Sequence, residues 1–223
     1  MLGSREALIL HVLEELSRDV ILVGGYAVNA YVPPRFSIDC DLVVLKGVAG
    51  IEKVLVKNGF EETERGEVPQ GEYIRFVHKK EAVSFDLLVH AVLDRDSKVV
   101  FEGSLFTRYS RERITVGRAN PIRISMKIAD PELLFAMKFV SARRQDIRDI
   151  FMLSGIEMNW NLIEELIKVK CDGELIKRRT ALIRAKIMGK SFRDGLHGAF
   201  GKIPEEIFND CSSKLIKFLD GLS

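Results

Sequence analysis

Two aspartates two positions apart, Asp39 and Asp41, are the first residues of the chain that could carry out chemistry. Their apolar neighbours predict a strand over residues 37–45, on which both carboxylates project from the same face. Two like charges this close repel each other unless they are solvated, protonated or bridged by a cation. Because Mg²⁺ binds one or two carboxylates together with substrate phosphate oxygens, the pair predicts a metal site.

A third carboxylate, Asp86, stands inside the apolar run from Val83 to Val89. A lone carboxylate in such a run is costly unless it has a partner. If the strands that carry Asp41 and Asp86 are neighbours, Asp86 completes a three-carboxylate site able to hold two metal ions.

A glycine pair, Gly24-Gly25, separates an expected strand over residues 20–23 from an expected helical turn over 26–31. Glycines at such a turn let backbone N–H groups approach a phosphate closely, and a helix N-terminus adds a favourable dipole. Strand-to-helix turns also use glycine for steric reasons alone. In combination with the three aspartates, the glycine pair favours a site for both metal and phosphate.

The hydrophobic spacing predicts an α+β half, about residues 1–125, followed by a helical half, about residues 126–223. Further strands are expected at 72–77 and 82–89, as an antiparallel hairpin, and irregular strands and loops over 99–124. Helices are expected at 6–16, 49–58, 161–169, 173–188 and 204–222. A long helix is also expected to begin at Asp130, pass Lys138 and extend past Arg144 toward Leu153.

Composition places the chain among folded proteins, because 47% of its residues are hydrophobic and 30% are charged. No apolar run reaches the roughly 18 residues that a membrane span needs, so no membrane association is expected. Three cysteines without a C-x-x-C pair predict reduced thiols and a cytoplasmic location.

Two segments of the chain resemble a known family. Gly24-Gly25 followed by Arg35-Phe-Ser37-Ile-Asp39-Cys-Asp41 resembles the GG-x-A…R-x-[ST]-x-D-h-D signature of the DNA-polymerase-β-like nucleotidyltransferase superfamily. The similarity is greatest to the branch of abortive-infection-type toxin nucleotidyltransferases. The second segment resembles the family's E-L-L-x-x-K…R-x-x-D-x-x-D-[LI] helix and runs from Pro131 to Ile150. The resemblance covers residues 1 to about 155.

The resemblance implies a nucleotidyltransferase-fold mixed sheet flanked by helices, with a helical domain after the catalytic one. Asp39 and Asp41 would be metal ligands, and Asp86 is added as a third on spatial grounds. Gly24 and Gly25, together with Arg35 and Ser37, would bind the nucleotide. Many members have Gly-Ser in place of Gly24-Gly25, so backbone amides must here replace the serine hydroxyl.

In the second segment the resemblance assigns Lys138 to the nucleotide phosphates. Asp149, with Asp146 as a further candidate, would line the site. On an uninterrupted helix Lys138 and Asp149 share a face, and Asp146 is roughly 80° away from it. The implied reaction moves a nucleoside monophosphate from an NTP, for instance ATP, to a hydroxyl, with Mg²⁺ or Mn²⁺ as cofactor and pyrophosphate as leaving group.

The acceptor is left open among RNA, a protein hydroxyl and a small molecule. Nine Lys and Arg residues between Lys168 and Arg193 could follow an RNA backbone, or could form the solvated side of an amphipathic helix. The branch also suggests a toxin–antitoxin partner. The competing hypothesis is a catalytically silent protein of the same fold that acts as a binding or antitoxin-like regulatory protein.

Overall fold

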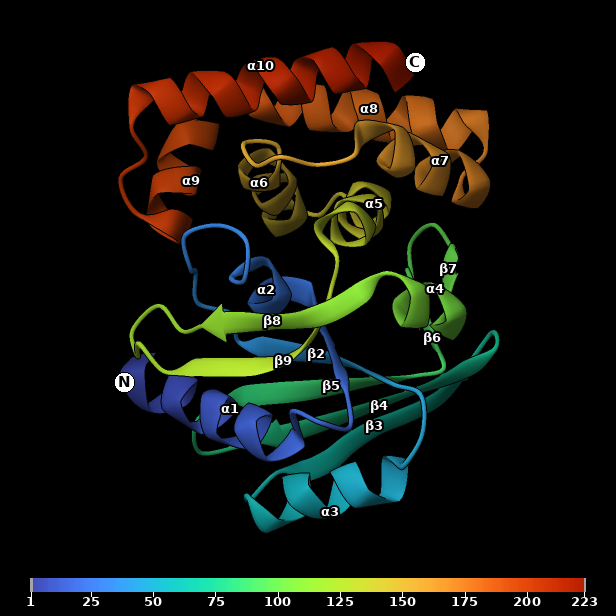
Figure 1. Ribbon diagram of the computed structural model, residues 1–223, viewed down its shortest axis with the longest axis vertical. Coiled ribbons are helices and arrows are strands. Elements are labelled where there is room, and N and C mark those ends of the chain that lie inside the picture. The colour runs from blue at the N-terminus through green and yellow to red at the C-terminus, as the bar shows by residue number, and fades with distance from the viewer. Residues whose placement is uncertain (1, 223) are drawn as a thin grey trace. The chain divides into compact units, whose positions relative to one another are not determined.

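The computed structural model describes residues 2–222, which form two compact units (Figure 1). The first, here called the sheet unit, contains the chain through Ala30 and the ranges 34–93 and 100–130. The second, the helical unit, contains 31–33, 94–99 and the chain from Pro131 onward. The predicted domain division near residue 125 remains a prediction, because compactness alone does not show that either part folds by itself.

Within the described residues, the sheet unit has a seven-stranded mixed sheet of order β3-β4-β5-β2-β1-β9-β8. Its strands are β1 (Ile21–Val23), β2 (Asp39–Val44), β3 (Glu61–Val68), β4 (Gly71–His78), β5 (Val83–Val89), β8 (Ser110–Val116) and β9 (Arg123–Ala129). Neighbours β2 and β5 run parallel, as do β1 and β9, and the other pairs are antiparallel. A separate hairpin joins β6 (Ala91–Leu93) and β7 (Val100–Glu102). The sheet confirms the predicted α+β class.

The central strands are those whose sequences are almost entirely apolar. Every residue of β1 is buried, and β5 is buried at all but one position, Leu88. Strands covered on both faces by other elements need such continuous runs, because neither face can be solvated. The predicted hairpin of β4 and β5 is confirmed, and so is the neighbourhood of β2 and β5 on which a role for Asp86 depends.

Strand β3 was not predicted from the sequence. All its residues except Val68 are exposed, and it forms one edge of the sheet, paired only with β4. A strand with no buried face has no apolar alternation, so the pattern that identifies other strands is missing here. Four of its eight residues are glutamates: Glu61, Glu62, Glu64 and Glu67.

The sheet unit contains the helices α1 (Leu2–Leu16), α2 (Gly24–Val28), α3 (Val48–Lys57) and α4 (Gly103–Arg108). Figure 1 shows α1 and α3 on one face of the sheet and α2 on the other. Helix α1 carries a fully buried carboxylate, Glu6, whose oxygens accept N–H donors from three consecutive residues of the β8–β9 turn. These donors are Arg118, Ala119 and Asn120, at 2.8, 2.6 and 2.8 Å.

Replacing Glu6 by alanine is expected to lower the free energy of unfolding by about 3 kcal/mol, because three charge-assisted hydrogen bonds to the buried carboxylate are lost together. Chemical denaturation measures the change. The exposed Glu14 on the same helix is the matched control, and its replacement by alanine should change stability by less than about 0.5 kcal/mol. Equal effects of the two substitutions would contradict the prediction.

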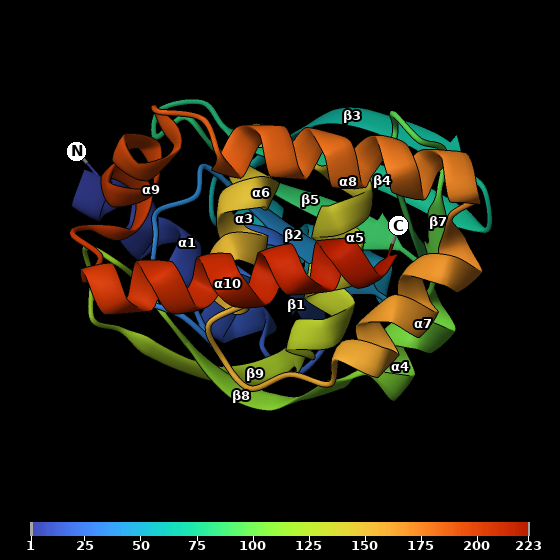
Figure 2. The same cartoon turned by 90° about the horizontal axis from the view of Figure 1, so that it is seen from above.

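The helical unit contains α5 (Pro131–Ser141), α6 (Arg144–Leu153), α7 (Trp160–Lys170), α8 (Gly173–Ile187), α9 (Phe192–Phe200) and α10 (Glu205–Leu222). Figure 2 shows α8 and α10 side by side, crossing over α6. Helix α9 was not predicted, since Gly195 and Gly198 weaken the helical pattern there. None of the helices in residues 2–222 combines the length and the apolar character that a membrane span requires.

The predicted long helix from Asp130 is wrong in one respect, because it is broken after Ser141. Ala142 has a φ of +48°, in the left-handed region, and α6 begins two residues later. The break is stabilised at the start of α6, where the backbone N–H of Arg143 donates to Asp146 Oδ2 over 3.3 Å. The relation of Lys138 to the two aspartates therefore differs from the one expected on a continuous helix.

Candidate active site

The three predicted carboxylates lie on neighbouring strands of the sheet unit. Asp39 and Asp41 occupy one face of β2, and Asp41 is the register partner of Asp86 on the parallel strand β5. Register partners on adjacent strands project to the same side of a sheet. The fold therefore gathers these three side chains on one face.

Arg75 on β4 joins this group, and sequence reasoning missed it. Its Nη2 atom donates to Asp39 Oδ1 over 2.7 Å, and its Nη1 atom lies 3.5 Å from Asp86 Oδ2. Ser84, the register partner of Asp39, donates its hydroxyl to the same Asp39 oxygen over 2.5 Å. The signal in the sequence was weak: a single arginine between the buried residues Ile74 and Phe76.

Asp86 is the most deeply buried of the three carboxylates, and its Oδ1 atom has no hydrogen-bond partner among the described residues. Burial, followed by the nearby charge of Asp41, raises the pKa of Asp86 from its usual value near 4 to about 7. A buried carboxylate oxygen without a partner is costly unless a proton or a cation reaches it.

These carboxylates form a donor set that fits a hard divalent cation, since Mg²⁺ takes oxygen ligands and one face provides three carboxylates. The orphaned Oδ1 of Asp86 supports that fit. The cluster is nevertheless not assembled as a three-ligand cage. Among residues 2–222, no group of three His, Cys, Asp or Glu side chains converges closely enough to hold a metal ion, and Asp39 is paired with Arg75 instead.

The glycine turn lies directly against Asp41. Val23, the last residue of β1, is the register partner of Asp41, and Gly24 follows it with a φ of +66°. A Cβ atom at position 24 would lie 1.8 Å from Asp41 Oδ2, so the carboxylate occupies the space that any side chain there would need. Gly24 is thus required both by its backbone conformation and by the closeness of Asp41.

Gly25 has the same relation to two other predicted residues. A Cβ atom there would lie 2.8 Å from both Arg35 Nη2 and Ser37 Oγ. Cationic and hydroxyl donors therefore fill the space next to Gly25 that a serine side chain would occupy. Because α2 has only five residues, its dipole adds little, and these side chains with the backbone amides are the donors at the turn.

Two buried polar residues, Tyr26 in α2 and Asn29 at its C-terminal end, hold the backbone of Ser37 and Arg35 in place. Neither was predicted as a site residue. Asn29 accepts the backbone N–H of Arg35 over 3.0 Å and donates to the carbonyl of the same residue over 2.9 Å. Tyr26 donates its hydroxyl to the carbonyl of Ser37 over 3.0 Å, and burial raises the pKa of Tyr26 well above its ordinary range. The turn and the segment before β2 are therefore tied together by local hydrogen bonds.

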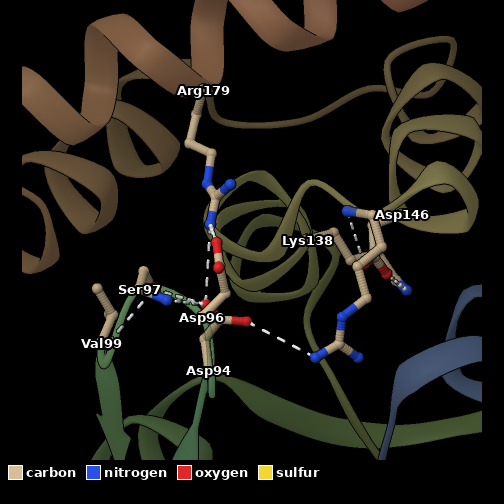
Figure 3. Close-up of polar contacts among 8 residues, drawn as sticks. Asp94, Asp96, Ser97, Val99, Lys138, Asp146 and Arg179 are labelled. Carbon is tan, nitrogen blue, oxygen red and sulfur yellow. Dashed lines mark hydrogen bonds and ion pairs between the residues drawn. The ribbon is translucent and has the colours of Figure 1, made fainter.

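Lys138 and its two candidate partners form a second cluster, within the helical unit. The Lys138 ammonium lies 2.7 Å from Asp149 Oδ2. It also lies 3.0 Å from Asp146 Oδ1, a residue that Figure 3 shows beside it. Asp149 is fully buried, and Lys138 is 6% exposed. The break at Ala142 brings Asp146 to the lysine, which corrects the geometry expected from a single helix.

The basic segment from Lys168 to Arg193 is not one continuous cationic face. Arg179 is buried and paired with Asp96 over 2.6 Å, as Figure 3 shows, so it is unavailable to an RNA backbone. Other members are ion-paired with carboxylates: Lys168 with Glu164, Arg184 with Asp220 and Arg193 with Glu205. Lys177, Arg178, Lys186 and Lys190 are exposed.

No protein-family profile matches the chain, and no curated protein matches it in sequence. Solved structures match it over nearly its whole length. A protein from H. pylori that is described provisionally as a nucleotidyltransferase has 16% identity and a TM-score of 0.50, over 99% of this chain and 96% of that one. JHP933 from Helicobacter pylori has 16% identity and a TM-score of 0.50, over 98% of this chain and 92% of that one.

MenT4, a nucleotidyltransferase toxin from Mycobacterium tuberculosis H37Rv, has 14% identity and a TM-score of 0.51, over 99% of this chain and 84% of that one. At these identities the likeness concerns the fold alone. It confirms the predicted nucleotidyltransferase fold.

Proposed function

We propose that this chain, which has the fold of the nucleotidyltransferases, is itself a metal-dependent nucleotidyltransferase that moves a nucleoside monophosphate from an NTP to a hydroxyl acceptor. The observation that carries the proposal is the placement of Asp39, Asp41 and Asp86 on one sheet face, directly against the Gly24-Gly25 turn. A protein that only binds a partner has no need to gather repelling carboxylates beside a glycine turn.

In this proposal Asp39 and Asp41 hold Mg²⁺ or Mn²⁺, with Asp86 as the third carboxylate. When bound, paired metal ions would stabilise the attacking and the departing oxygens of the transfer. The backbone amides of Gly24 and Gly25, together with the Arg35 guanidinium and the Ser37 hydroxyl beside Gly25, are the donors proposed for the triphosphate.

Lys138 is proposed as a phosphate-binding residue, and Asp149 as a residue lining the site, on the resemblance alone. Within the helical unit the Lys138 ammonium is held by Asp146 and Asp149. Fixing a long lysine side chain in this way reduces the entropy lost when it binds a phosphate. The RNA acceptor, the toxin–antitoxin partner and the cytoplasmic location likewise stay predictions.

The proposal is tested by incubating the protein with each labelled NTP, Mg²⁺ and total RNA or cell lysate. Asp39→Asn should slow label transfer about 10³-fold, because metal-supported charge stabilisation contributes several kcal/mol in the transition state. The exposed Asp19→Asn is the matched control and should transfer label like the wild type. Absence of transfer by the wild type, with no Mg²⁺-NTP thermal shift that Asp39→Asn removes, would refute catalysis.

One observation favours the alternative of a catalytically silent protein. Arg75 and Ser84 both bind the Asp39 oxygen that a metal ion would need. In a silent protein this ion pair would be permanent. The label-transfer experiment distinguishes the two hypotheses. A silent protein that still binds nucleotide would show a thermal shift with Mg²⁺-NTP and transfer no label.

A further inference from the structure

A cavity of about 280 Å³ lies in the helical unit between α6, α8 and α9. It is lined by Arg144, Ile147, Arg148, Lys186, Ser191 and Phe192. Three of these six residues are cationic and none is acidic. The cavity is made entirely of residues outside the carboxylate cluster and outside the Lys138 cluster.

Two cationic residues of this cavity differ from the other basic residues nearby in that they form no ion pair within the described part of the chain. Arg179, Arg184 and Arg193 are each paired with a carboxylate. Arg144 and Lys186 form no ion pair with any residue in the range 2–222. Cations gathered around a hollow repel one another, and an anion between them removes that repulsion.

A glycine of α9, Gly195, leaves room for the side chain of Arg148. A Cβ atom at Gly195 would lie 2.2 Å from Arg148 Nη2, so the guanidinium lies in the space that a side chain there would occupy. Arg148 also donates to the side-chain oxygen of Gln145 over 3.2 Å. The hydroxyl of Ser191, at the start of α9, makes no capping hydrogen bond to that helix. The cavity therefore combines a positioned guanidinium with a hydroxyl that does not cap α9.

We propose that this cavity binds a phosphate group. Two guanidinium groups match phosphate oxygens in pairs, while an ammonium and a hydroxyl supply further donors. The volume leaves room for the group to which the phosphate is attached. The phosphate has two possible sources, a phosphodiester of an RNA strand or a small phosphate such as pyrophosphate. The site shares no residue with the proposed catalytic ones, and phosphate binding there does not depend on their activity.

The first test reverses charge at the cavity in the full-length protein. Binding of a short single-stranded RNA and of pyrophosphate is measured without divalent metal, at low salt, in the Asp39→Asn background. The double variant Arg144→Glu/Lys186→Glu should bind at least one of the two ligands about 10-fold or more weakly than its parent, because two phosphate contacts are lost. Lys217→Glu, an exposed residue of helix α10 outside both the cavity and the Lys168–Arg193 segment, should change either affinity less than about 2-fold.

The second test changes no charge. Gly195→Ala should displace the Arg148 guanidinium and weaken binding of the same ligand. Gly198→Ala is the control on the same helix: its Cβ atom would meet no atom within 4 Å, so binding should stay unchanged. Thermal unfolding checks that both variants fold. Weaker binding of RNA assigns the site to a phosphodiester, and weaker binding of pyrophosphate assigns it to a small phosphate. Unchanged binding in the double variant, or equal weakening by Lys217→Glu, overturns the proposal.

Discussion

Alanine at position 24 is expected to lower nucleotidyl transfer by about 100-fold or more, because a misplacement of about 1 Å in a catalytic group can cost that much. The new Cβ atom would lie 1.8 Å from Asp41 Oδ2, so the carboxylate has to move away from the turn. The backbone conformation, with φ at +66°, adds roughly 1–2 kcal/mol of destabilisation for any residue with a Cβ. Initial rates of label transfer and chemical denaturation measure the two effects.

Gly47 separates these two effects. It has a φ of +76°, yet a Cβ atom there would meet nothing within 4 Å. Gly47→Ala should therefore show the roughly 1–2 kcal/mol conformational cost and keep normal activity. If Gly24→Ala is as active as Gly47→Ala, the position of Asp41 against the turn is not needed for transfer.

Removal of the Lys138 ammonium is expected to lower the free energy of unfolding by about 3–5 kcal/mol, because the fully buried Asp149 carboxylate loses the ion pair that it makes over 2.7 Å with Lys138. Loss of activity in Lys138→Ala would then be ambiguous between unfolding and chemistry. Asp146→Asn is a milder comparison, expected to cost about 1 kcal/mol, since its side chain is 16% exposed.

An apolar replacement of the pair resolves the ambiguity. Lys138→Met combined with Asp149→Leu should recover at least half of the stability lost in Lys138→Ala, because apolar residues can replace a buried ion pair without loss. Recovered stability without recovered transfer would support a role of Lys138 at the phosphates. Recovery of both would show that the pair is structural only.

The carboxylate strand was predictable because its signal is local. Asp39 and Asp41 alternate with apolar residues on one strand, and the glycine pair lies close in sequence. The neighbourhood of Asp86 could only be assumed, since strand order depends on the whole sheet. The only sequence signal for Arg75 was its place between two apolar residues, and its partner Asp39 is 36 positions away, so the ion pair could not be predicted.

The break between α5 and α6 could not be predicted from the sequence for a different reason. Neither glycine nor proline marks it, and alanine at position 142 favours helix by propensity. Ala142 has a left-handed φ, is buried, and lies where Lys138 and Asp146 meet across the break, and none of these features is marked in the local sequence. The short segments 31–33 and 94–99, which belong to the helical unit, likewise have no composition that separates them from the sheet unit.

The exposed strand β3 bears on how copies of this protein behave at high concentration. An edge strand presents unpaired N–H and C=O groups, which invite another chain to extend the sheet. This strand carries four glutamates and one arginine, Arg65, so its net charge is negative although Glu62 pairs with Arg65 and Glu61 with Lys79. The edges of two copies would bring two such negative strands together. Like charges facing each other oppose such pairing, so the glutamates of β3 disfavour edge-to-edge association of the sheets of two molecules.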